Sequence, residues 1–409
     1  MVIWRVVVLW LTLATQAIAN TTPAAAMPAF HIYQDADQSH HFTSTNAIQL
    51  GIELAFAEVD NQLGGYPVEF IYLDHRGNVI RSLQNLEQFI DDPRALALFS
   101  GMHSPPLIKH RDFINQHQIL TLVPWAAGGP ITRFPDPINW IFRLSIDDTQ
   151  AGKFLVDFAV PQYCSQPHLL LENTPWGDAN LQTISAALAA KAIQPDVTRF
   201  NIATQPLSAR AILRAIDASN SDCILLVGNA IESATLVKAM SQVPNERSLP
   251  IISHWGIAAG DFQARVPASL RKQLSLYFIH SCFSMSEQPL TRYVASIFDR
   301  LAQITQDRVT TPTELPAAVG FVHAYDLTKV LIAAAAQTTL TGEAAQDRTA
   351  IRHALENLEQ PVAGLIKTYQ KPFTRYDTEH TNAHEALDSN DYCMAEFNSD
   401  GTVKVIPRQ

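Results

Sequence analysis

The sequence predicts an α/β protein made of two doubly wound, Rossmann-like lobes. Short apolar stretches typical of strands alternate with helical patterns along most of the chain, and this rhythm occurs in two runs. Strands that alternate with helices of about 10–15 residues form parallel sheets, which helices cover on both faces. The two runs meet near residues 143–148, so we expect each run to build one lobe.

The first run opens with a strand pattern, AFHIY, at residues 29–33. A helical pattern follows at 46–62, where apolar residues recur at helical spacing until Gly64-Gly65 ends it. The same reasoning predicts further strands at 68–74, 96–101 and 119–124 and helices at 79–90 and 105–117.

The second run follows the apolar stretch NWIFRLS at 139–145. It predicts helices at 150–160, 178–192, 207–219 and 231–242 and strands at 168–172, 197–202, 223–228 and 249–253. After a strand at 274–281 come three helical patterns, at 288–304, 314–338 and 347–358. Too few strands accompany these helices for a third sheet, so we expect them to pack on a lobe already built.

The N-terminus has the three-part layout of a secretory signal peptide. Arg5 precedes an apolar run at residues 6–13, and small residues occupy the −3 and −1 positions of a cut before Asn20. The run is shorter than the roughly 20 apolar residues that span a bilayer, which disfavours a membrane anchor. We therefore expect cleavage of residues 1–19 and a periplasmic protein, and no cysteine follows the run for lipid attachment.

The amino-acid composition is typical of a globular protein, and the chain is long enough for two domains. The chain has 409 residues, of which 47% are hydrophobic and 17% charged. A net charge of −10 argues against nucleic acid and anionic membrane surfaces as partners. The most apolar later stretch, VLIAAAAQ after Lys329, is interpreted as a buried helix.

The four cysteines are compatible with one or two disulfides in an oxidising compartment. No CxxC pair occurs, which disfavours metal clusters and redox motifs. The sequence leaves their pairing open. These residues are Cys164, Cys223, Cys282 and Cys393.

A ligand site is expected where strands end. In doubly wound sheets the binding crevice lies outside the carboxyl ends of the strands. The loops that follow predicted strands are 34–45, 101–105, 124–130, 172–178, 228–232 and 253–260.

Three segments resemble the type I periplasmic binding proteins, and most closely the leucine/isoleucine/valine- and amide-binding receptors of ABC transporters. They are LGIELAFAEVDNQLGG, FSGMHS and ILTLVPWAAGGPITR, and they occur in the family's order. The resemblance implies three crossings between the lobes, near 143–148, 278–283 and 359–366. It gives one lobe from 28–144 plus 282–360 and the other from 145–281 plus 361–409.

The resemblance also implies ligand contacts. Ser104 stands where the family's receptors bind a ligand carboxylate. The next loop offers backbone amides at Trp125, Ala126 and Ala127, but Ala127 replaces an expected threonine. In the second lobe, Trp176 precedes a glycine as the family's aromatic residue does.

The acidic residue expected before Gly256 is replaced by Trp255, with His254 beside it. Without a carboxylate there, the ammonium group of an amino acid would be left largely unpaired in a closed cleft. The sequence therefore predicts a ligand other than an ordinary α-amino acid.

Three tryptophans, Trp125, Trp176 and Trp255, follow predicted strands. They are interpreted as flat apolar walls for an aromatic, alicyclic or otherwise hydrophobic molecule, with Ser104 and His254 fixing its polar end. Packing at the ends of the sheets is the alternative interpretation of each tryptophan.

Other kinds of site are disfavoured. Four cleft-loop histidines have the chemistry to meet around a metal ion, but histidines on polar loops are more often solvated. No phosphate-binding glycine motif and no paired nucleophile and base occur, so neither a cofactor nor catalysis is expected. The histidines are His40, His41, His103 and His254.

The predicted function is capture of a small solute by hinge closure, for delivery to an ABC permease in the inner membrane. A monomer is expected. One alternative is a receptor that docks on a membrane sensor kinase. The other is a carrier of a bulky lipid-like molecule, for which Ala127 and Ala230 would leave room.

Overall fold

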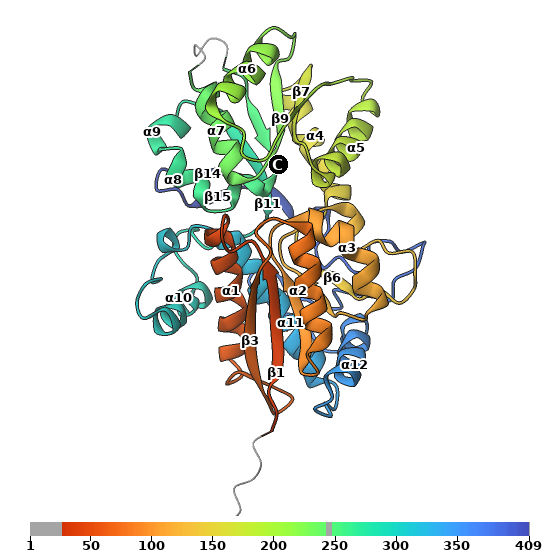
Figure 1. Ribbon diagram of the computed structural model, residues 1–409. Helices are drawn as coiled ribbons and strands as arrows, with labels where there is room; N and C mark the ends of the chain where they lie inside the picture. The colour runs from red at the N-terminus through yellow and green to blue at the C-terminus, as the bar shows by residue number, and fades with distance from the viewer. Residues whose placement is uncertain (1–26, 243–247, 409) are drawn as a thin grey trace, which may run out of the picture.

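The computed structural model describes residues 27–242 and 248–408, and it shows two lobes, one above the other in Figure 1. Each lobe is built around its own mainly parallel sheet with helices packed against it. The predicted α/β class with two doubly wound lobes is confirmed. The predicted signal peptide, residues 1–19, lies outside the described residues.

The first sheet has the strand order β2-β3-β1-β4-β5-β6. All neighbours are parallel except the short edge strand β2 (Gln62–Leu63), which pairs antiparallel with β3. The parallel strands are β1 (Phe30–Ala36), β3 (Tyr66–Asp74), β4 (Ala95–Ser100), β5 (Thr121–Val123) and β6 (Ile141–Arg143).

Side chains of the first sheet alternate between two apolar cores. On β1, Ile32 belongs to the core that includes α1 (Phe42–Ala57) and α11 (Ala318–Ala336). The next residue, Tyr33, packs with α2 (Val79–Asp91) and α3 (Ser104–Gln116) on the other face. This alternation is what the pleat of a strand dictates.

Helix α11 is the Ala-rich helix predicted after Lys329. It packs so closely on α1 that a Cβ at Gly51 would lie 2.4 Å from the carbonyl oxygen of Phe321. Among the described residues it alone is long and apolar enough to cross a membrane, but 78% of that stretch is buried within the protein. It begins at Ala318 rather than at 314, because Pro312–Glu314 form a separate 3-10 turn.

Helices α10 (Arg292–Thr305) and α12 (Ala344–Glu356) also pack on the first lobe (Figure 1). The helical patterns predicted after residue 281 therefore add to an existing lobe, as expected.

The second sheet has the order β15-β14-β11-β10-β9-β7-β8. Five strands are parallel, and the last two strands of the chain add antiparallel at one edge. The strands are β7 (Pro167–Glu172), β8 (Asp196–Phe200), β9 (Cys223–Val227), β10 (Ile251–Ser253), β11 (Leu276–Ser281), β14 (Tyr392–Phe397) and β15 (Val403–Ile406).

The helices of the second lobe pack in pairs, α4 with α5 and α6 with α7. Two short helices, α8 and α9, precede β11. Their bounds are α4 (Asp148–Gln162), α5 (Pro175–Ala189), α6 (Pro206–Asp217), α7 (Ala230–Met240), α8 (Asp261–Arg265) and α9 (Ala268–Arg271).

Two disulfides fasten the second sheet. Cys164 pairs with Cys223 at the start of β9, and Cys282, just after β11, pairs with Cys393 of β14. The sequence left this pairing open. One bridge joins the segment after α4 to β9, and the other joins the segment after β11 to the C-terminal strand β14. Cross-links that close loops of this length typically contribute about 2–4 kcal/mol to stability.

The last passage between the lobes uses the segment before β14. A hairpin of β12 (Val362–Ala363) and β13 (Thr368–Tyr369) packs on α11, where the Tyr369 hydroxyl donates to Asp326. Phe373 then packs edge-on against Phe142 of β6, in the first sheet. These contacts favour a third crossing after Phe373 rather than at 359–366, and the division of the chain into lobes stays a prediction.

Candidate functional site

A small pocket lies between the two lobes, with about 10 Å³ of free space, roughly enough for one water molecule. Residues that follow β4 and β5 line it from the first lobe, and residues at the ends of β7, β9 and β10 line it from the second. The carboxyl ends of both sheets therefore supply the site, as doubly wound topology dictates. The lining residues are Met102, His103, Ser104, Pro105, Trp125, Ala127, Glu172, Trp176, Asn229, Trp255 and Gly256.

The structure brings five of the seven predicted contact residues to this pocket: Ser104, Trp125, Ala127, Trp176 and Trp255. The other two, Ala126 and His254, do not line it.

Ser104 is the first residue of α3, and its Oγ accepts a hydrogen bond from the backbone N–H of Gly128 at 3.0 Å. This bond joins the loop after β5 to the start of α3. Ala126 instead belongs to the apolar core beside α3, and its carbonyl accepts from the Arg143 guanidinium at 3.3 Å. The Ser104 hydroxyl can still donate its own proton to a ligand.

Trp125 and Trp255 meet across the two lobes, with ring centroids 5.7 Å apart. Both also pack on the first lobe. A Cβ at Gly320 of α11 would lie 2.5 Å from the Trp125 ring, and the Trp255 ring lies 5.0 Å from that of His323. These two tryptophans therefore combine the two interpretations that the sequence left open, since they wall the pocket and close the lobe junction.

Trp176 differs from the other two tryptophans. It is 5% exposed, and its indole Nε1 is buried with no hydrogen-bond partner among the described residues. A buried donor that lacks a partner costs about 1–3 kcal/mol, so such groups usually bind something. Since Trp176 lines the pocket, the natural acceptor is an oxygen atom of a ligand.

His254 makes a different contact from the one the sequence suggests. Its Nε2 lies 2.7 Å from Asp148 Oδ1, and both side chains are fully buried within the second lobe. Burial raises the pKa of Asp148, although the facing His254 opposes that rise. The ring stands edge-on to Trp176, so His254 supports the pocket wall instead of fixing a ligand.

Sequence reasoning missed Glu172, the last residue of β7. Its side chain lines the pocket, and burial together with the nearby Glu232 raises its pKa to about 7. Asn229 donates to its Oε2 at 3.3 Å. The signal was a single acidic residue at the end of an apolar strand, HLLLE.

Gly177 allows α5 to begin beside Glu172. A Cβ at Gly177 would lie only 1.8 Å from the Glu172 carbonyl oxygen, so no larger residue fits. The Trp-Gly pattern thus places the indole of Trp176 and the carboxyl of Glu172 in one pocket. A carboxyl group is present after all, on a different strand from the one expected.

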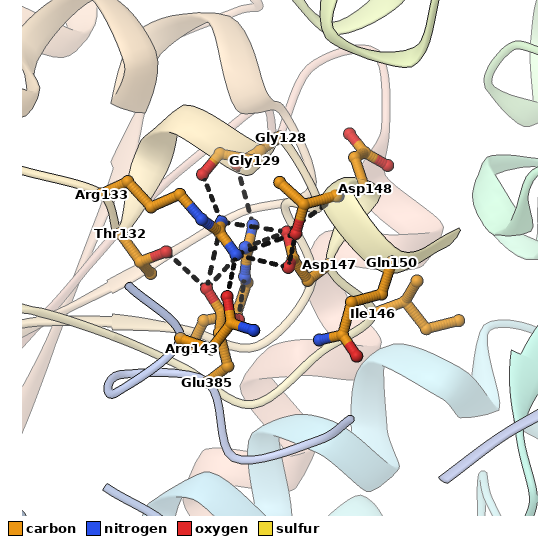
Figure 2. Close-up of polar contacts among 12 residues, drawn as sticks. Gly128, Gly129, Thr132, Arg133, Arg143, Ile146, Asp147, Asp148, Gln150 and Glu385 are labelled. Carbon is orange, nitrogen blue, oxygen red and sulfur yellow. Dashed lines mark hydrogen bonds and ion pairs between the residues drawn. The ribbon is translucent and has the colours of Figure 1, made fainter. Parts of the chain in front are cut away.

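Beside the pocket, a buried ion network marks the first crossing between lobes (Figure 2). Arg143, at the end of β6, is fully buried, and its guanidinium donates to both oxygens of Glu385 at 2.7 Å and to Asp147 at 2.8 Å. Burial would raise the pKa of Asp147, but Arg143 and Arg133 together hold it below its usual value.

The same guanidinium donates to the carbonyl of Gly128 at 2.9 Å, and the Gly128 N–H donates to Ser104. The backbone N–H of Asp147 in turn donates to the hydroxyl of Tyr392, on β14. The network therefore connects Ser104, at the start of α3 in the pocket, with the second sheet. No pattern in the sequence indicates this network, because Arg143 and Glu385 lie 242 residues apart.

A family model described as "Periplasmic binding protein" matches residues 41–401, most of the chain. The chain belongs to this family. The predicted family and the predicted function class, a solute-binding protein of the periplasm, are thereby confirmed. No curated protein sequence matches the chain.

Solved structures of periplasmic binding proteins share this fold. One is a solute-binding protein of Rhodopseudomonas palustris HaA2 in complex with p-hydroxybenzoic acid, with a TM-score of 0.73 and 15% identity over 92% of this chain and 95% of that one. A branched-chain amino acid receptor of Streptococcus pneumoniae in complex with isoleucine has a TM-score of 0.70 and 15% identity, covering 93% and 99%. A fatty acid receptor of Thermomonospora curvata has a TM-score of 0.73 and 13% identity, covering 92% and 91%.

Proposed function

We propose that this periplasmic binding protein is the receptor of an ABC importer and that it captures a small solute between its lobes. The observation that supports this proposal most directly is the pocket, to which both lobes contribute polar groups beside the tryptophans. A ligand that touches both walls favours the closed form, which a permease in the inner membrane would recognise. Residues 1–19 would be removed on export, and the receptor would act as a monomer.

The pocket is suited to a flat or apolar body with two different polar ends. Ser104 and the Trp176 Nε1 donate to an acceptor such as a carboxylate or amide oxygen. With a pKa near 7, Glu172 accepts from a hydroxyl or amide N–H of the ligand when it is ionised. We infer an aromatic or hydrophobic acid or amide that carries a hydrogen-bond donor, with 4-hydroxybenzoate as the first compound to test.

Two alternatives fit the pocket less well. A bulky lipid needs far more space than this small pocket offers. An enzyme needs an activated nucleophile, whereas the described contact of Ser104 Oγ is with a backbone amide. Docking on a sensor kinase would use the same ligand-closed shape as docking on a permease, so co-purification with either membrane protein separates these two partners.

The test is isothermal titration calorimetry with 4-hydroxybenzoate, benzoate, benzamide, leucine and palmitate. We expect the aromatic acids or the amide to bind, and 4-hydroxybenzoate to bind more tightly than benzoate, because only 4-hydroxybenzoate has a hydroxyl group to donate to Glu172. The variant Glu172→Gln should reduce this difference, whereas Glu87→Gln, at an exposed position on α2, should leave it unchanged. Tight binding of leucine with no binding of the aromatic compounds would contradict the proposed ligand class.

A further inference from the structure

Three adjacent strand ends bring histidines together at the rim of the pocket. Strands β3, β1 and β4 are parallel neighbours, so their carboxyl ends lie at one edge of the first sheet. Asp37 and His41 follow β1, His75 follows β3, and His103 follows β4. Residues about 30 positions or more apart in the sequence thus meet on one side of the cleft.

We infer that Asp37, His41 and His103 form a binding site for a divalent transition-metal ion. One ligand atom from each side chain lies within 4.8 Å of the others. Two imidazole nitrogens and one carboxylate oxygen are a donor set that Zn²⁺ and similar ions take, with further positions left for water or a ligand group. The proposal departs from the expectation that these loop histidines are solvated.

Burial separates this cluster from an ordinary surface group of polar side chains. Asp37 is 3% exposed and His41 7% exposed. The rings of His41 and His103 are in contact, with centroids 4.8 Å apart, and the His75 ring lies 5.7 Å from that of His103. The Nδ1 atom of His103 is buried with no hydrogen-bond partner among the described residues.

Surrounding hydrogen bonds hold the proposed ligands in place. The Asp37 carboxylate accepts from the backbone N–H of His40 at 2.9 Å, and the Asp37 carbonyl accepts from the Thr45 hydroxyl at 3.0 Å. A Cβ at Gly77, whose φ is +66°, would lie 3.2 Å from Asp37 Oδ2, so a glycine keeps that oxygen clear. Outer contacts that orient metal ligands are typical of real metal sites.

The dipoles of two helices oppose the binding of a cation at this site. His41 and His103 occupy the N-cap positions of α1 and α3, where the helix dipoles favour negative charge. The Asp37 carboxylate offsets this effect, and dipole effects are small beside the bonds between a transition metal and two imidazoles. Because His103 also lines the pocket, a bound ion would add positive charge to the first-lobe wall, where the ligand's acceptor end is expected.

The chain contains a matched control on its surface. His380 contacts Asp377 through the same ring nitrogen and at the same spacing as His40 contacts Asp37. Both His380 and Asp377 are exposed, and no third ligand is grouped with them among the described residues. A site that needs the buried cluster should therefore ignore a change at His380.

The experiment titrates Zn²⁺ alone into purified, EDTA-treated protein by isothermal titration calorimetry, so it does not depend on the proposed solute. We expect about one tight site, at least about tenfold weaker in His103→Ala, His41→Ala and Asp37→Asn and unchanged in His380→Ala. Asp37→Asn keeps the size of the side chain. Circular dichroism melting in EDTA checks that each variant folds, and Zn²⁺ should raise the melting temperature more in the wild type and His380→Ala than in the three cluster variants.

Cobalt gives an independent readout, because Co²⁺ bound by two histidines and a carboxylate absorbs visible light. The proposal is overturned if the wild type binds no Zn²⁺ at micromolar concentrations. It is also overturned if folded His103→Ala and Asp37→Asn keep wild-type affinity, or if His380→Ala removes the site.

Discussion

The buried ion network around Arg143 and the ligand pocket are neighbours, but they differ in how well their buried polar groups are paired. Around Arg143 the charged groups are matched, with the carboxylates of Asp147 and Glu385 facing the guanidinium groups of Arg143 and Arg133. In the pocket, Trp176 Nε1 has no partner among the described residues and Glu172 has its pKa raised to about 7 by burial. Paired charges stabilise the lobe junction, whereas a donor without a partner and a carboxyl group with a raised pKa mark where a ligand binds.

This contrast assigns different consequences to substitutions on its two sides. A change in the network should cost stability, because it leaves charges buried without a partner. A change in the pocket should act chiefly on affinity. Four predictions test this division, in order of decreasing expected effect.

The largest effect is expected for Arg143→Ala. Removing the guanidinium leaves Glu385 and Asp147 buried close together, which costs about 3–5 kcal/mol of unfolding free energy. Urea unfolding measures the loss. The control Arg300→Ala breaks the ion pair with Glu58, where the arginine side chain is 48% exposed, and it should cost about 1 kcal/mol or less. Equal losses of unfolding free energy in both variants would show that the network stabilises the protein no more than an exposed ion pair does.

Glu172→Gln should change how stability depends on pH. The pKa of Glu172 is about 7 in the folded protein against an ordinary 4.5, so the folded chain holds a proton that the unfolded chain releases between these values. Stability from this group is present below pH 4.5 and is lost as pH rises through 7. Glutamine removes that loss and should stabilise the protein at pH 8 by up to about 3 kcal/mol. Unfolding curves at pH 5 and pH 8 test this, and a glutamine variant with the wild-type pH dependence would refute it.

Trp176→Ala should weaken binding of the ligand by about tenfold or more, since buried aromatic residues dominate such sites. Trp176→Phe keeps most of the apolar surface and removes only the N–H donor, so its loss should be smaller. Calorimetry with the best compound from the panel measures both variants. An unchanged affinity in Trp176→Ala would exclude this side chain from the site.

Ser104→Ala should have the smallest effect, a loss of about 2–10-fold in affinity for a ligand with a carboxylate or amide oxygen. The variant also loses the acceptor for the Gly128 N–H, so a small fall in melting temperature is expected. Comparing an acid with the analogue that lacks its carboxylate separates the two effects. Equal losses for both compounds would show that Ser104 acts only through the loop.

The sequence predicted those parts of the molecule that depend on local pattern. Helix α2 was expected at 79–90 and spans Val79–Asp91, and β7 was expected at 168–172 and spans Pro167–Glu172. Periodic burial within one element determines such segments, so neighbours along the chain suffice. Ser104, Trp125 and Trp176 reached the pocket for the same reason, because each follows a strand.

Features that join distant segments were out of reach. The partners of Arg143 depend on how the chain folds back on itself. His254 was expected in the cleft, because a loop position does not reveal that Asp148, 106 residues away, binds its ring. Glu172 was overlooked because an acidic residue was sought before Gly256 and not at the end of β7.

The contact between Trp125 and Trp255 makes the tryptophan fluorescence of the protein sensitive to the separation of its lobes. The two indoles come from opposite lobes and lie 5.7 Å apart, so any separation of the lobes exposes both rings to water. Indole emission shifts to longer wavelength in a more polar environment; Trp176 in the pocket responds in the same sense, while Trp140 is buried in the first lobe. The molecule thus carries an unlabelled spectroscopic gauge of its own closure, which needs neither a dye nor knowledge of the cargo.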